Sequence, residues 1–357
     1  MTSVPSEMAE PPPTLDFRHG GLNDRERAWR DRQPWLQERG YMLRPRYRPD
    51  WKPSWLGTDK SFIGCEDGLT ILSGNILDAT RISDGTLVML KQVNSRVHPH
   101  EVEITRFLSS EPVASDPRNH CMRLVDVLPD PSEQDVSIIA VALFKQLIEG
   151  LQFIHAQHVA HRDITILNVM MDASAMYPNM WHPQMPIFNR DYYSGSVKHY
   201  SRTERPPKYY YIDFGLSRKY NPEDGPPREL PIRGGDKSVP EFQGEGYDKP
   251  WDPFRTDIYY LGSLIREAFL EKYRNVDFMR PLVDDMVQDN PDKRPTIDEV
   301  ASRSELLFGQ LSSWKLRARL VEREETAFTR TTRNISHLFH TARHIVRRLP
   351  AVPLPSK

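Results

Sequence analysis

A change in hydrophobic periodicity along the chain is the feature that most constrains the fold. Residues 76–93 contain two apolar-rich runs joined by Ser83-Asp84-Gly85-Thr86, a hairpin signal. Helical spacing of apolar residues begins at 100–109 and then dominates, over residues 142–157, 256–271, 279–288 and 296–308. Chains whose strands gather early and whose helices gather late form α+β folds. We therefore expect a small antiparallel-sheet lobe followed by a larger helical lobe.

Composition excludes several classes of protein. The two cysteines, Cys65 and Cys121, are too few for a disulfide framework or a multi-cysteine zinc site, and they fit a reducing compartment. No stretch reaches the roughly 18 uninterrupted apolar residues of a membrane span. A net charge of −1 argues against a protein whose whole surface binds along a nucleic-acid backbone, so no specific nucleic-acid partner is expected. We predict an intracellular protein, cytoplasmic or nuclear.

The N-terminal extension, residues 1–60, is rich in tryptophan and tyrosine. Residues 24–56 predict one short helix and then an extended arm against an apolar surface. Stacking on nucleic-acid bases is the alternative use of these aromatic side chains. From residue 62 to 93 the composition becomes strand-like.

The most specific chemical signal is His161-Arg162-Asp163, with Asn168 five residues after the aspartate and Asp213-Phe214-Gly215 further on. A carboxylate at Asp163 can accept a proton from an attacking hydroxyl. Asn168 and Asp213 offer the hard oxygen ligands that Mg²⁺ prefers when it bridges nucleotide phosphates.

In these motifs the chain resembles the eukaryotic protein kinase superfamily. The resemblance implies a bilobal kinase-like fold and transfer of phosphate from ATP, with Mg²⁺, to serine or threonine of a protein substrate whose identity stays open. It implies that Asp163 is the catalytic base, that Asn168 and Asp213 bind the metal, and that Arg162 steadies the activation segment. RPRYRPDW in the extension, the aromatic insert and FGLS also resemble an expanded kinase-like group from mushroom-forming fungi.

Further matches follow in the family's order. Val88-Met89-Leu90-Lys91 resembles the strand whose lysine holds the nucleotide phosphates, and Glu101 stands where its partner glutamate would be. The helical phase favours Glu101 over the alternative Glu103. The resemblance also implies that Gly74 and Ile76 contact the nucleotide.

Three scaffold matches separate protein kinases from small-molecule kinases of the aminoglycoside and choline type. Glu241, the helix start at 257–262 and Arg294 resemble the platform on which a peptide docks. They favour a protein substrate, while a small-molecule substrate is the less favoured alternative.

Departures from the family pattern favour a second interpretation, in which the chain is a catalytically impaired pseudokinase that acts as a scaffold or interaction module. Thr165 stands where a lysine is usual, and Leu69 and Ile71 occupy glycine positions. Only 36 residues separate Val127, the expected end of a fourth strand, from Asp163, so an apparent fifth strand at 136–141 leaves no room for the usual adenine-binding hinge. A fault in the gene sequence would have the same effect.

Forty-five residues separate Asn168 from Asp213, more than the family pattern has. Most of them form an insert, residues 173–208, whose aromatic side chains predict that it packs. It is either a lid or partner surface or lineage-specific padding. Residues 209–212 should form the strand that delivers Asp213.

The C-terminal tail predicts a basic amphipathic helix. Residues 314–349 carry nine Lys or Arg against three Glu, with apolar residues at helical spacing. Such a helix can dock on the helical lobe with its basic face in solvent, make a peripheral membrane contact or bind nucleic acid. The expected boundaries are 1–60 for the extension, 61–141 for the N-lobe, 142–312 for the C-lobe and 313–357 for the tail.

Overall fold

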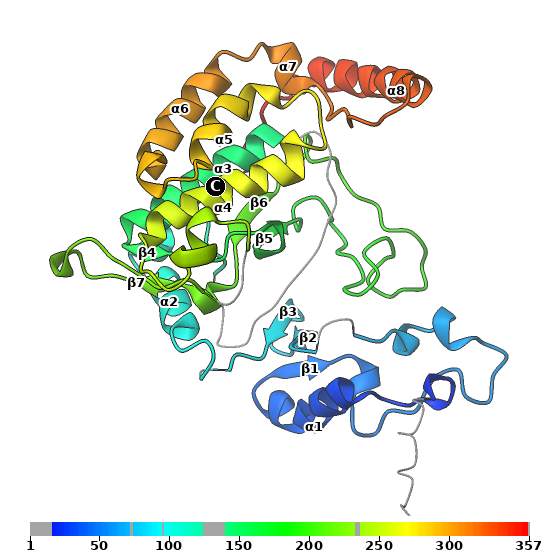
Figure 1. The fold of residues 1–357 in the computed structure, drawn as a ribbon. Helices are drawn as coiled ribbons and strands as arrows, with labels where there is room; N and C mark the ends of the chain where they lie inside the picture. The colour runs from blue at the N-terminus through cyan, green and yellow to red at the C-terminus, as the bar shows by residue number, and fades with distance from the viewer. Residues whose placement is uncertain (1–15, 72–73, 95, 124–139, 233–235, 356–357) are drawn as a thin grey trace, which may run out of the picture. The chain divides into compact units, whose positions relative to one another are not determined.

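The computed structural model describes residues 16–71, 74–94, 96–123, 140–232 and 236–355. These residues form two units (Figure 1). The sheet unit consists of the described residues up to Gln92 together with Trp181–Ser196, and the helical unit consists of the others. The fold is a mixed α+β fold with small antiparallel sheets, as the periodicity predicted.

An antiparallel three-stranded sheet organises the sheet unit. Its strands are β1 (Tyr41–Leu43), β2 (Ile76–Arg81) and β3 (Leu87–Lys91), in the order β1-β2-β3. The predicted hairpin at Ser83–Thr86 joins β2 to β3 and is confirmed. Gly85 has a φ of 71°, the left-handed conformation that favours glycine in such a turn. The register places Ile76 opposite Lys91.

The N-terminal extension packs on this sheet through its aromatic side chains. Helix α1 (Asp24–Glu38) begins with a capping box in which Asn23 and Glu26 each accept a hydrogen bond from the other's backbone N–H. Trp29, Tyr41 and Tyr47 are buried in one cluster with Leu77 and Leu90. The packing interpretation of the aromatic arm is therefore confirmed.

The rest of the extension differs from the expected arm and strand. Residues 45–47, 62–64 and 66–68 form short 3₁₀ turns, so the strand prediction for 62–93 is wrong at 62–68, whereas β2 and β3 confirm it at 76–81 and 87–91. The physical reason lies in contacts with an earlier part of the extension: the Asp67 carboxylate accepts hydrogen bonds from the Trp51 indole and from the backbone and hydroxyl of Ser54. A buried ion pair between Arg46 and Glu26 joins this region to α1.

The middle of the aromatic insert, Trp181–Ser196, packs in the sheet unit, while the two ends of the insert belong to the helical unit. His182 is buried and contacts the Glu66 carboxylate at 3.3 Å. The Tyr193 hydroxyl accepts a hydrogen bond from the Glu66 backbone N–H, and Gln184 donates one to Asp78. These contacts hold the segment Trp181–Ser196 without regular secondary structure of its own.

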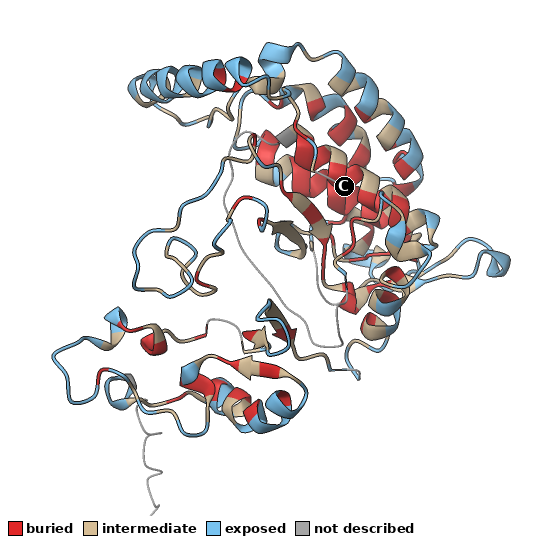
Figure 2. Cartoon of the chain, turned by 180° about the vertical axis from the view of Figure 1, so that it is seen from behind, coloured by how far each residue is buried: buried red, intermediate tan, exposed pale blue. Residues whose placement is uncertain are grey.

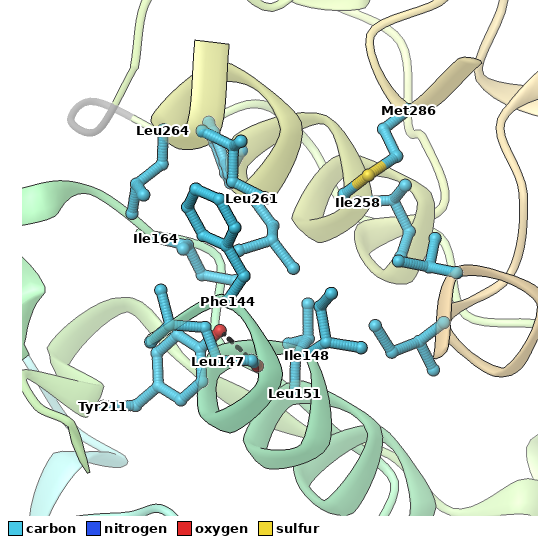
Figure 3. Close-up of a cluster of buried hydrophobic side chains, with 14 of the residues drawn as sticks. Phe144, Leu147, Ile148, Leu151, Ile164, Tyr211, Ile258, Leu261, Leu264 and Met286 are labelled. Atoms are coloured by element: carbon cyan, nitrogen blue, oxygen red, sulfur yellow. Dashed lines mark hydrogen bonds between the residues drawn. The ribbon is translucent and has the colours of Figure 1, made fainter. Parts of the chain in front are cut away.

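The helical unit is built around one long buried helix. Its helices are α2 (Glu101–Leu108), α3 (Ala140–Ala156), α4 (Pro253–Ile265), α5 (Arg280–Met286), α6 (Ile297–Gly309), α7 (Ser313–Arg317) and α8 (Ala327–Val346). Phe144, Leu147 and Leu151 of α3 pack against Leu261 and Leu264 of α4 in the core (Figures 2 and 3). The helices expected at 100–109, 142–157, 256–271, 279–288 and 296–308 are confirmed, and α4 ends in a π turn at Arg266–Leu270.

Helix α3 corrects one prediction. Its first residues, Ala140 and Val141, were expected to end a fifth strand but are helical, because the helical apolar spacing that starts at Ala142 extends back through two residues compatible with a helix. Residues 136–139, the predicted strand end at Val127 and the shortened hinge lie outside the described residues. Among the described residues, no helix combines the length and apolar content needed to cross a bilayer.

Candidate active site

Two short β-ladders bring the loops of Asp163, Asn168 and Asp213 together in the helical unit. Strand β4 (Val159–Ala160) pairs with β7 (Arg218–Lys219), and β5 (Val169–Asp172) pairs with β6 (Lys208–Tyr211). The chain between β4 and β5 carries residues 161–168, and the chain between β6 and β7 carries 212–217. Both loops are therefore held side by side between the same two ladders. β6 also confirms the strand predicted to deliver Asp213.

Hydrogen bonds between the two loops fix their relative position. The His161 imidazole contacts the Ile212 carbonyl oxygen at 3.0 Å, and the Ser217 hydroxyl donates to the His161 carbonyl oxygen at 2.9 Å. His161 and Ser217 are completely buried. A polar contact that is shielded from water in this way holds both backbones firmly.

Asp257 of α4 anchors the first loop. Its completely buried carboxylate accepts hydrogen bonds from the backbone N–H groups of His161 and Arg162, each at 2.7 Å. His155 of α3 contacts the same carboxylate at 3.0 Å. Arg162 has a φ of 67°, a conformation that is costly for a side chain other than glycine. The bond from its N–H to Asp257 compensates for that strain and aims the next residue, Asp163.

The Arg162 side chain crosses to the segment after Asp213. Its guanidinium donates to the carbonyl oxygens of Leu216 and Leu230 and lies 3.5 Å from the Glu229 carboxylate. This single side chain therefore ties the loop of Asp163 to residues 216–230, which agrees with the steadying role implied by the resemblance.

Asp163 and Asn168 are in direct contact. The Asn168 amide donates to the Asp163 Oδ2 at 2.9 Å and to the Asp163 backbone carbonyl oxygen at 2.8 Å. Burial raises the pKa of the Asp163 carboxyl, and the negative charges of Asp213 and Asp257 raise it further, against the opposing effects of His161 and Asn168. A raised pKa makes the ionised Asp163 carboxylate a stronger proton acceptor.

Asp213 stands at the start of a 3₁₀ turn, Phe214–Leu216, in the left-handed conformation with a φ of 61°. Its Oδ1 accepts a hydrogen bond from the Gly215 N–H at 3.3 Å. A Cβ at Gly215 would lie 2.7 Å from the His98 ring, so glycine is required for this close approach. Strained aspartates of this kind concentrate at functional sites.

Glu101 faces inward from α2, as its helical phase predicted. It is buried, whereas the Glu103 side chain is 81% exposed. Helix α2 packs on residues 214–216, and His98 just before it contacts the Gly215 carbonyl oxygen. The helical unit therefore holds Glu101 on a helix that contacts the Asp213 segment.

Lys91, Ile76 and Gly74 lie in the sheet unit. Lys91 and Ile76 are opposite partners on β3 and β2, so their side chains share one face of the sheet. Gly74 is close to α1: its carbonyl oxygen accepts a bond from the Trp29 indole, and a Cβ there would lie 2.5 Å from Arg25. Packing on α1 alone explains this glycine. Lys91 and Glu101 belong to different units, so their pairing stays a prediction.

Glu241 and Arg294 form the scaffold pair implied by the resemblance. The guanidinium donates two hydrogen bonds, at 2.7 and 2.6 Å, to the two carboxylate oxygens, and both side chains are buried. Thr256 of α4 donates a further bond to Glu241. The pair fixes the end of the 213–241 segment to the helical core.

A cation fits this site chemically. Burial is the largest cause of the raised Asp163 pKa, and the negative charges of Asp213 and Asp257 add to it; positive charge beside Asp163 and Asp213 would offset that added repulsion. Within the residues that the structure describes, no group of three or more His, Cys, Asp or Glu side chains is arranged to hold a metal ion. Asn168 and Asp213 would therefore need phosphate oxygens of a nucleotide to complete a magnesium shell.

Sequence reasoning assigned Asp257 only to a scaffold helix and did not identify His155. The signal for Asp257 was present, because an isolated carboxylate in the apolar run Ile258–Leu261 is costly to bury without a specific set of donors. His155 had no comparable signal, since it looks like an ordinary polar residue near a helix end.

Comparison with known proteins adds no family to this picture. No protein-family model matches the chain, and no curated protein matches it.

Proposed function

We propose that the chain is a protein kinase-like phosphotransferase that uses ATP and Mg²⁺ to phosphorylate serine or threonine of a protein. The strongest support is the grouping of Asp163, Asn168 and Asp213 on two loops that are hydrogen-bonded to each other and anchored by Asp257. Carboxylate and amide oxygens placed around a half-buried proton acceptor are the groups that phosphoryl transfer from a nucleotide requires.

Each residue has a distinct role in the proposed reaction. Asp163 orients the substrate hydroxyl and takes its proton, and Asn168 holds the Asp163 carboxylate through Oδ2. Asn168 and Asp213 also offer the oxygens for Mg²⁺, which supplies charge neutralisation of the phosphates when bound. Lys91 is the proposed phosphate contact from the sheet unit, and Glu101 its proposed partner. Arg162 keeps the 216–230 segment in place.

A pseudokinase is the second candidate, and two observations favour it. Thr165 leaves the loop without the usual lysine, and its backbone carbonyl instead accepts a bond from the Asn168 N–H. Gly74 is closely packed against Arg25 and Trp29, which assigns this glycine a structural use. A scaffold protein would keep the fold of the two loops without transferring phosphate.

Transfer of labelled phosphate tests the proposal. The full chain is incubated with Mg²⁺, ATP labelled on its γ-phosphate and a mixed peptide library containing serine and threonine. We expect labelled peptide, and a loss of about 100-fold or more in Asp163→Asn, since a general base contributes about 10² to 10⁴ in rate. Asp284→Asn, at an exposed position of α5, is the matched control and should be unchanged. Absence of transfer by the parent chain contradicts the proposal, and label found only in small molecules supports the small-molecule alternative.

A further inference from the structure

Helix α8 is attached to the helical unit by its polar side. The buried residues of this 20-residue helix are Thr341 and His344, and its apolar residues point outward. Phe328 is 80% exposed, Phe339 73% and Val346 82%. Figure 2 shows the helix as largely exposed. The docking predicted from the sequence, with the apolar face inward, is therefore wrong for this helix.

Specific polar contacts explain this orientation. The His337 ring contacts the Arg317 carbonyl oxygen at 2.7 Å, and Arg319 donates to the Asn334 side chain at 2.8 Å. Arg333 forms ion pairs with Glu322 and Glu325. At the far end, Arg347 pairs with Glu204, whose pKa is lowered to about 2, first by hydrogen bonds from the Ser201 backbone and also by the arginine. The inner side is therefore fixed in the middle of the helix and at its C-terminal end.

The outer side carries an apolar strip. At about 100° per residue, positions separated by three, four or seven residues share a face. The exposed apolar residues follow this spacing along the helix: Phe328, Ile335, Leu338, Phe339, Ile345 and Val346. A helix of 20 residues is about 30 Å long, so the strip is larger than a scatter of single exposed residues. Contiguous apolar surfaces of this kind mark interaction sites.

The positive charge of α8 indicates what kind of partner binds the apolar strip. Residues 327–348 contain five arginines and no Asp or Glu. On a helical wheel, Arg343 lies next to the apolar strip. Within the described residues, neither Arg343 nor Arg348 takes part in an ion pair. A second copy of this helix would bring like charges together. An exposed helix that has Phe and Leu on one face, carries arginines and lacks acidic residues has the composition of helices that lie in the interface of an anionic bilayer.

We propose that the outer face of α8 inserts into the interface of an anionic lipid bilayer, with its apolar strip among the acyl chains and Arg343 and Arg348 at the headgroups. This is independent of the proposed catalytic activity. The polar contacts of the inner side keep the helix lying along the surface of the protein, so that the whole helical unit is brought to the membrane.

Co-sedimentation of the full chain with vesicles tests the proposal. Vesicles of phosphatidylcholine are compared with vesicles of phosphatidylcholine mixed with phosphatidylserine, at low and high salt. We expect binding to the mixed vesicles that weakens with salt. The triple variant Phe328→Ser, Phe339→Ser, Val346→Ser should lose at least about tenfold in affinity, because membrane binding scales with inserted apolar area. Leu306→Ser, an equally exposed apolar residue of α6, is the matched control.

A second variant separates insertion from charge. Arg343→Glu should weaken binding to the mixed vesicles only, while Lys249→Glu, a distant exposed cation, should not. Circular dichroism checks that each variant keeps its helices. Absence of binding to anionic vesicles overturns the proposal, as does binding that the triple variant leaves unchanged. A dimer that the triple variant dissolves, or binding to an oligonucleotide without binding to vesicles, would assign the face to another occupant and also overturn it.

Discussion

Replacing Asp257 by asparagine should loosen the loop that carries Asp163. The carboxylate accepts two backbone hydrogen bonds at 2.7 Å in a completely buried position. Hydrogen bonds to a charged group contribute about 1.5 to 3 kcal/mol each. The neutral side-chain oxygen of asparagine can accept one of the two backbone hydrogen bonds. Its NH₂ group would face the second backbone N–H, so that two donors would meet. We therefore expect Asp257→Asn to reduce the local stability of residues 161–162 by about 2 to 4 kcal/mol.

Hydrogen exchange followed by mass spectrometry measures this change at the affected peptide. A loss of about 2 to 4 kcal/mol corresponds to exchange about 30-fold to 700-fold faster for a peptide covering residues 160–163. Asp285→Asn, which removes a surface ion pair with Arg303, is the matched control and should cost less than about 1 kcal/mol. Exchange in Asp257→Asn that rises no more than in the control would refute the anchoring role of Asp257.

Three further variants test other parts of the structure. Gly150→Ala should destabilise the protein by about 1 to 3 kcal/mol and lower its melting temperature, because the new Cβ would lie 2.7 Å from His120. Gly309→Ala places its Cβ in open space and should leave the melting temperature unchanged. Arg294→Met should lower the free energy of unfolding by about 3 to 5 kcal/mol, because it leaves Glu241 buried without its partner. In urea unfolding, the double variant Glu241→Leu, Arg294→Met should recover part of this loss. An equal loss in the single and the double variant would contradict this reasoning. The raised pKa means that the folded protein favours the neutral form of the Asp163 carboxyl. The protonated carboxyl therefore stabilises the fold below its unfolded-state pKa, and this stabilisation is lost as pH rises through the folded-state pKa. Asp163→Asn should therefore melt no lower than the parent at neutral pH and should lose less stability between acid and neutral pH, and a lower melting temperature at neutral pH would count against the raised pKa.

The helices and the hairpin could be predicted because their signals are local. The spacing of Leu143, Phe144 and Leu147 marks a helix whatever it packs against, and Asp84-Gly85 marks a turn. The grouping of Asp163, Asn168 and Asp213 came from motif order and not from periodicity. The ladders that hold their loops together contain strands as short as two residues, which carry no pattern of their own.

Features that depend on distant partners could not be predicted. The amphipathic pattern of α8 shows that two faces exist, but contacts of Arg333 and Arg347 with Glu325 and Glu204 decide which face turns inward. Gly74 fits a phosphate loop by position, yet its neighbours are Arg25 and Trp29, more than forty residues earlier. The 3₁₀ turns at 62–68 replace a strand because Asp67 bonds to Trp51 and Ser54.

Binding of ATP with Mg²⁺ is the most direct test of the proposed nucleotide site, in which Asn168 and Asp213 are the proposed metal ligands and Lys91 is the proposed phosphate contact. Thermal unfolding of the full chain is followed with ATP and Mg²⁺, with ATP and a chelator, and without ligand. The account predicts a rise in melting temperature that grows with ATP concentration, requires Mg²⁺ and disappears in Lys91→Ala and Asp213→Asn, but persists in Lys249→Ala and Asp284→Asn. No stabilisation of the parent chain at any ATP concentration, or the same stabilisation in all four variants, would contradict it.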